Sequence, residues 1–137
     1  MKAFKISIIG LALILTLALS ACSDSKIKDG TYTGKSLPDD VGDIGEVTIV
    51  IEDGEIKDCM YVSYDKKGNI KDENYGKDSG NDEFYKKAQI AVDGINSYSK
   101  QLIEKKQLEL VESVSGATIS YNQFNEAVND ALQKATE

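Results

Sequence analysis

The sequence has no histidine and no arginine, so all 16 of its basic residues are lysines, set against 23 acidic residues. Without imidazole groups there is no histidine metal site, and hydrolytic catalysis would lack its commonest general base. The absence of arginine and the excess of acid argue against recognition of a phosphate backbone. We therefore expect neither a nucleic-acid partner nor a hydrolytic enzyme.

Long apolar runs are absent except at the N-terminus, where residues 1–21 combine Lys2 and Lys5 with an apolar run over residues 6–19. This pattern is typical of a secretory signal peptide, and the run is shorter than the ~20 apolar residues that span a bilayer. The sequence Leu-Ser-Ala-Cys at residues 19–22 resembles the lipobox of bacterial lipoproteins, in which the cysteine is diacylated and becomes the mature N-terminus. An ordinary signal peptide with an incidental Cys22 is the alternative, and a pheromone role for the cleaved leader is a further one.

Lipidation of Cys22 by chains such as palmitate would anchor the protein to the membrane from outside the cytoplasm, with residues 22–28 as a short polar tether. Two acyl chains hold a protein where one is marginal. Removal of the leader takes away two lysines and no acid, which leaves 14 lysines, 23 acids and a net charge of −9. Cys59 would then have no disulfide partner, and we interpret it as a small buried residue on a strand.

The mature chain begins with signals for strands. Residues 29–35 predict a short first strand, and residues 37–45, which include the only proline, predict a loop. Residues 46–52 and 55–64 flank Asp53-Gly54, a pair preferred in tight hairpin turns because both central residues need positive φ. Alternation along 46–52 places Val47, Ile49 and Ile51 on one face, so the sequence predicts a β-hairpin with one face on a core.

Two helices follow. Asn81 or Asp82 can cap a helix that runs to about Lys106 and carries Gly94, which we interpret as a bend or a close approach. Its apolar stripe recurs at steps of three and four residues and consists of Phe84, Ala88, Ala91, Ile95, Tyr98 and Leu102.

Residues 108–112 alternate over a short stretch that fits a strand, and Ser120 with Gln123 resembles a capping box that opens the last helix. The apolar face of that helix consists of Phe124, Ala127, Val128, Ala131, Leu132 and Ala135. We predict an α+β fold in which a small antiparallel sheet packs against two amphipathic helices, forming a single domain over residues 29–137.

The stretch Glu112-Ser113-Val114-Ser115-Gly116-Ala117-Thr118-Ile119-Ser120 carries the candidate chemistry. The approach to a helix N-terminus offers unpaired N–H groups and partial positive charge, which suit a phosphate. Gly116 and Ala117 leave room for such a group, and because the stretch has no lysine, binding would depend on backbone dipoles. The alternative is a plain turn and cap, with Thr118 a spectator.

Residues 112–118 closely resemble the flavinylation motif of the FMN-binding domain family, in which an acidic residue is followed after two positions by Ser/Thr-Gly-Ala-Thr. The opening at residues 29–34, the hairpin and the closing helix are similar to the family as well. The family includes covalent-FMN subunits of sodium-pumping NADH:quinone reductases and Rnf complexes. The resemblance implies that a flavin transferase esterifies the FMN phosphate to Thr118. The family usually has aspartate where this chain has Glu112.

The resemblance further implies cofactor contacts from Glu112, Ser115, Gly116 and Ala117 and a redox carrier rather than a free-standing enzyme. Its electron donor would be a membrane quinol or dehydrogenase, and its acceptor would be extracytoplasmic. The alternative is a surface lipoprotein without flavin that acts as a binding module. Candidates to cover the flavin ring are three tyrosines in or beside predicted loops, Tyr32, Tyr75 and Tyr121.

Overall fold

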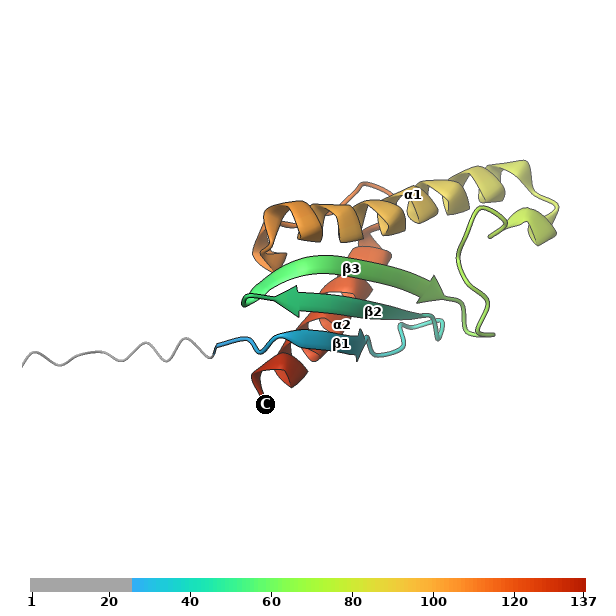
Figure 1. Ribbon diagram of the computed structural model, residues 1–137. Helices are drawn as coiled ribbons and strands as arrows, with labels where there is room; N and C mark the ends of the chain where they lie inside the picture. Colours follow the sequence, from blue (N-terminus) through green and yellow to red (C-terminus); the bar gives the residue numbers. More distant parts are fainter. Residues whose placement is uncertain (1–25) are drawn as a thin grey trace, which may run out of the picture.

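The computed structural model describes residues 26–137, which fold as a three-stranded antiparallel sheet in the order β1-β2-β3 with two long helices (Figure 1). The strands are β1 (Gly30–Lys35), β2 (Ile44–Glu52) and β3 (Glu55–Tyr64). The helices are α1 (Asp82–Lys105) and α2 (Thr118–Thr136), with short 3₁₀ turns η1 (Lys77–Ser79) and η2 (Leu108–Leu110). The predicted single α+β domain is confirmed.

The hairpin lies where the sequence predicts it. Asp53 and Gly54 have φ values of 54° and 72°, which fits the tight turn. Val47, Ile49 and Ile51 are buried on one face of β2, while the residues between them are only partly buried. The sheet therefore has one core face. On that face α1 packs against β3, and α2 packs against β1 and β2.

Helix α1 begins after Asn81, whose side-chain oxygen accepts hydrogen bonds from the N–H groups of Glu83 (3.0 Å) and Phe84 (3.1 Å). Most of the predicted apolar stripe is buried, but Phe84 remains 47% exposed near the start of the helix. The predicted apolar face of α2 is buried except for Leu132, which is partly buried, and Phe124 stacks on Tyr98 of α1 with ring centroids 5.6 Å apart. The two helices and the sheet thus share one core.

The strand predicted over residues 108–112 is wrong. The N–H groups of Leu110 and Val111 donate to the carbonyls of Gln107 (3.2 Å) and Leu108 (3.0 Å), which forms the 3₁₀ turn η2. The buried residues here are Leu108 and Val111, and their spacing of three fits one 3₁₀ turn rather than a period of two. The short alternation was too brief to distinguish the two periods.

The capping box at Ser120 is also wrong, because α2 begins two residues earlier, at Thr118. Ser120 lies in the first turn and is 4% exposed. The side chain of Gln123 donates instead to the Asp39 carboxylate (3.2 Å) and the Asp43 carbonyl (3.0 Å). Packing of the β1–β2 loop on α2 therefore outcompetes the local pattern.

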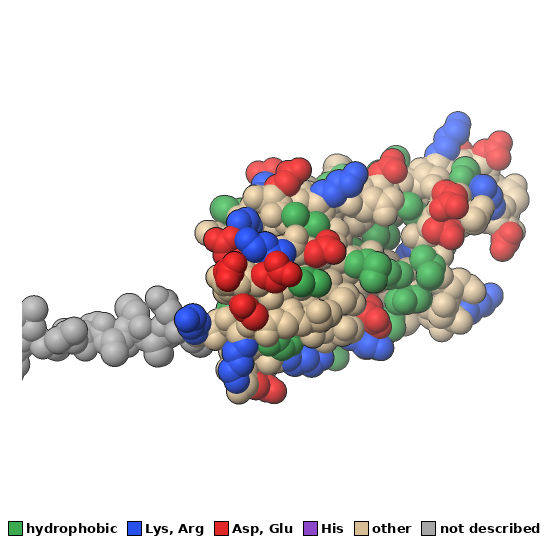
Figure 2. Space-filling model, viewed as in Figure 1, with side chains coloured by type: hydrophobic (Ala, Val, Ile, Leu, Met, Phe, Trp, Pro, Cys, Tyr) green, Lys and Arg blue, Asp and Glu red, His purple; other side chains and the backbone are tan. Residues whose placement is uncertain are grey.

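The predicted leader, Cys22 and the first part of the tether lie outside the described residues. Ile27 packs at the edge of the core, and the Lys28 N–H donates to the Ala135 carbonyl (2.9 Å). The chain therefore enters the domain beside the end of α2. Among residues 26–137 no helix has the length and apolar character needed to cross a bilayer. Charged side chains of both signs are interspersed over the face drawn in Figure 2.

Candidate functional site

The N-terminus of α2 is open. Ala117 occupies the N-cap position with φ −127° and ψ 24°, and no side chain caps the helix. The first turn carries no acidic residue. The N–H groups of Thr118, Ile119 and Ser120 therefore have no partner within the helix, since the first turn has no preceding carbonyls to use. The Thr118 side chain is exposed beside these donors.

Helix α1 holds the segment that leads into this open end. The side-chain amide of Gln101 accepts from the Glu112 N–H (2.8 Å) and donates to the Glu112 carbonyl (3.1 Å). The Tyr98 hydroxyl accepts from the Val114 N–H (3.1 Å) and donates to the Ala117 carbonyl (2.9 Å). These four bonds fix the path of the loop, so Thr118 is held in a set position.

Two glycines allow close contact between this loop and α1. A Cβ on Gly94 would lie 2.2 Å from the Cβ of Ala117, so the predicted close approach is confirmed. Gly116 has φ 86°, and a Cβ there would lie 2.6 Å from the Ile90 side chain. Larger side chains would force the two segments apart, because contacts this short do not occur between packed atoms.

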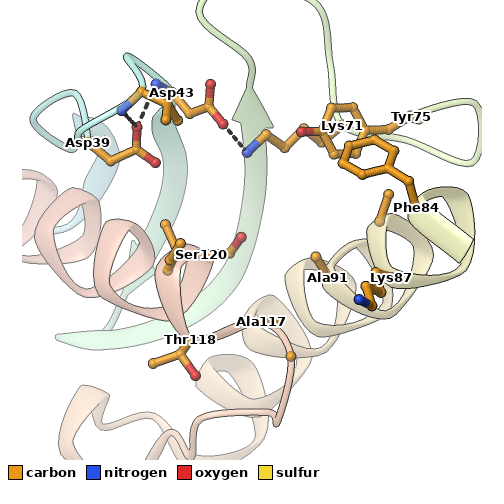
Figure 3. Close-up of a pocket in the computed structure, with 14 residues that line it drawn as sticks. Asp39, Asp43, Lys71, Tyr75, Phe84, Lys87, Ala91, Ala117, Thr118 and Ser120 are labelled. Atoms are coloured by element: carbon orange, nitrogen blue, oxygen red, sulfur yellow. Dashed lines mark hydrogen bonds and ion pairs between the residues drawn. The ribbon is translucent and has the colours of Figure 1, made fainter. Parts of the chain in front are cut away.

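Thr118 borders a pocket of about 430 Å³ (Figure 3). Four segments far apart in sequence meet there: residues 39–43, 71–75, 84–91 and 116–120. Apolar side chains make up part of the wall, namely Val41, Phe84, Ala88, Ala91 and Ile119. The pocket thus combines an apolar wall with the polar start of a helix, which is the usual character of a small-molecule site.

A buried ion pair lies in the pocket wall. Lys71 Nζ is 2.5 Å from Asp43 Oδ2, and the two side chains are 9% and 11% exposed. The ammonium is also 5.3 Å from the centre of the Tyr75 ring. Asp43 is held in turn by the Lys66 N–H, at 3.0 Å from its other oxygen. The geometry therefore orients the Lys71 charge between a carboxylate and an aromatic face.

The structure adds two lysines that sequence reasoning missed. Lys71 comes from the segment after β3 and Lys87 from α1, and both line the pocket with Thr118. Lys87 is exposed. The stretch itself has no lysine, but the pocket it borders has two. No local signal could have found these residues, because they lie more than 30 positions from Thr118.

The first turn of α2 is fixed by contacts to the sheet. The Tyr61 hydroxyl donates to the Ser120 carbonyl (2.9 Å). Burial raises the pKa of Tyr61 well above its ordinary value, so the hydroxyl keeps its proton and remains a donor. The Gln123 side-chain oxygen is buried without a partner, while its amide nitrogen holds the Asp39–Asp43 loop. The β1–β2 loop is therefore held against α2, and the two form one wall of the pocket.

Four of the predicted site residues meet in the pocket, namely Thr118, Ala117, Gly116 and Tyr75. Glu112 and Ser115 do not line it. The Glu112 side chain is 87% exposed, with a carboxylate oxygen 3.9 Å from Lys105 Nζ.

Two of the three tyrosines considered for the flavin ring also lie elsewhere. The Tyr32 hydroxyl is 3.4 Å from the Asp29 carbonyl near the hairpin turn, and the Tyr121 hydroxyl donates to the Val111 carbonyl (3.0 Å). Tyr75 alone of the three borders the pocket.

Cys59 is 5% exposed on β3, as predicted for a buried residue. Burial raises the pKa of its thiol to about 11, which leaves it protonated and poorly reactive near neutral pH. Within residues 26–137 no group of three or more His, Cys, Asp or Glu side chains is placed to hold a metal ion.

Comparisons with known proteins show what the chain is similar to. The 15 kDa lipoprotein of Treponema pallidum (strain Nichols) is 29% identical over 131 residues, which cover 90% of this chain and 87% of that protein. The crystal structure of the CPE2226 protein from Clostridium perfringens is similar at a TM-score of 0.63 and 26% identity, covering 80% of this chain and 88% of that one. The FMN-binding domain matches residues 41–133, which is more than half of the sequence. The chain therefore belongs to the FMN-binding domain family.

Proposed function

We propose that this protein carries FMN esterified through its phosphate to Thr118 and acts as a lipid-anchored electron-transfer module outside the cytoplasm. The observation that carries the proposal is the exposed Thr118 hydroxyl at an uncapped helix start that opens on a pocket. A covalent bond suits such a location, because even a nanomolar complex loses its cofactor when no free pool refills it.

The residues present fit this cofactor. The free N–H groups of the first turn of α2 and the exposed Lys87 suit a phosphate diester. The apolar wall with Tyr75 and Phe84 suits a flat aromatic ring system, and a volume of about 430 Å³ lies in the range of small-ligand sites. Lys71, paired with Asp43, lies in the same wall.

Attachment requires a flavin transferase and an activated flavin nucleotide, since a phosphate ester does not form from free phosphate in water. The bond that forms joins the Thr118 oxygen to the flavin phosphorus. The bond that breaks is the phosphoanhydride of the donor nucleotide. The other part of the donor leaves as a nucleoside monophosphate, and the hydroxyl proton passes to solvent. Thr118 is exposed, so the hydroxyl is open to a modifying enzyme.

The bound FMN would supply the redox chemistry, and this chain would orient it, limit its contact with water and set the local charge. The proposed electron donor is a membrane quinol or dehydrogenase, and the acceptor is extracytoplasmic. Diacylation at Cys22 would keep the domain at the membrane, in line with the relative described as a lipoprotein.

Co-expression with a flavin transferase tests the attachment. We expect the protein to gain the mass of an FMN phosphoester and to show flavin fluorescence in a denaturing gel. Thr118→Ala should abolish both signals, whereas Ser113→Ala, which removes an exposed hydroxyl of the same loop, should leave them intact. A wild-type protein that stays colourless with an active transferase would contradict the proposal.

The anchor is tested separately. Cys22→Ser should move the protein out of the membrane fraction or block its processing. If the variant sediments with membranes as the wild type does, the lipid anchor is wrong and the flavin proposal is untouched.

A further inference from the structure

A second hollow, of about 460 Å³, lies next to the pocket and shares Asp39, Val41 and Ile119 with it. Exposed apolar side chains form part of its lining. Among the described residues, the three most exposed large hydrophobic side chains are Leu37 (76%), Ile119 (63%) and Val41 (62%), and all three line this hollow. Exposed apolar side chains gathered at one place mark an interaction site rather than ordinary surface.

The charged residues that line the hollow are all acidic: Asp39, Asp40 and Glu126. Asp39 and Glu126 hold the β1–β2 loop, since the carboxylate of Glu126 accepts from the Leu37 N–H (3.0 Å) and that of Asp39 from the Val41 N–H (3.0 Å). Asp40 is exposed, so an outside partner can reach its carboxylate. The hollow is therefore an apolar surface with a negative rim.

We propose that this hollow is the docking face for a protein redox partner that presents an apolar patch ringed by lysine or arginine. The proposal rests on the flavin at Thr118. Ile119 follows Thr118 directly and belongs to both cavities, so a partner seated in the hollow lies against the rim of the flavin pocket. Opposite charges raise the rate of encounter, and the apolar contact fixes the docked position.

A bilayer is a poorer occupant on grounds of charge. Anionic lipid repels an acidic rim.

The first experiment maps binding on the chain from Ser23 to Glu137, which retains every described residue. The probe is cytochrome c, a basic redox protein, added to the isotope-labelled chain without flavin. We expect amide shift changes centred on residues 37–41 and 119–126. Changes centred elsewhere, or none, would overturn the proposal, as would the same changes on addition of phosphatidylglycerol vesicles.

The second experiment uses the flavinylated protein after chemical reduction. Each reduced flavin passes two electrons to two molecules of cytochrome c, and its protons pass to solvent. Ile119→Ser and Asp40→Asn should each lower the second-order rate constant by about threefold or more at low salt. Matched controls are Met60→Ser, at a 60% exposed position of β3, and Glu109→Gln, at an exposed acid of η2; both should react as the wild type does.

Equal slowing in the controls would overturn the docking face. A chain that carries no flavin would contradict the proposed function, while the binding map would still test the docking face.

Discussion

The two long helices begin in opposite ways. At the start of α1, Asn81 caps two N–H groups, and Asp82 and Glu83 place negative charge in the first turn. At the start of α2 there is neither a side-chain cap nor an acid. The first end satisfies its own donors and its own dipole. The start of α2 leaves its N–H donors and its dipole unsatisfied, which is unfavourable for the isolated fold. It is therefore suited to an anion supplied from outside.

The largest expected effect concerns the contact that positions the open end. Gly94→Val would drive a side chain into Ala117, so we expect a loss of about 2–3 kcal/mol in the free energy of unfolding, measured by urea denaturation. Asn96→Val, at an exposed position of the same helix, should change it by less than about 0.5 kcal/mol. Similar losses for both variants would show that the Gly94 contact is not tight.

Asn81→Ala removes the side-chain cap at the start of α1. Two N–H groups lose their acceptor, so we expect the free energy of unfolding to fall by about 1 kcal/mol. Flavin loading at Thr118 should not change, since Asn81 does not line the pocket. Urea denaturation and in-gel fluorescence measure the two effects, with Asn96→Ala as the control. An Asn81→Ala variant that folds well but carries little flavin would contradict the separate roles of the N-termini of α1 and α2.

The smallest effect comes from giving α2 the charge that α1 already has. Ile119→Glu places an acid in the first turn of α2 and should stabilise the unmodified chain by about 0.5 kcal/mol at low salt. It should also slow flavin loading, because the carboxylate repels the incoming phosphate. Ile119→Gln has the same shape without the charge and serves as the control. If both variants load at the same rate, charge at this end does not govern attachment.

Much of the fold is readable from local signals. The Asp53-Gly54 turn with alternating flanks defined the hairpin, and Asn81 with its apolar stripe defined α1. Local signals failed where the sequence pattern covered only a few residues. Residues 108–112 and the pair Ser120 and Gln123 each fit a common pattern, but packing against the core and the β1–β2 loop decided otherwise.

By itself the sequence determined which residues could carry the chemistry: a Thr118 preceded by small residues in the approach to the last helix, in a chain without histidine or arginine. Only the tertiary structure decided what surrounds that hydroxyl. Lys71 with Asp43, Lys87 and Tyr75 reach the pocket from segments distant along the chain, while Glu112 and Tyr32 do not. The physical reason is that local backbone preferences act over a few residues, whereas a pocket is made where long-range packing brings separate segments together.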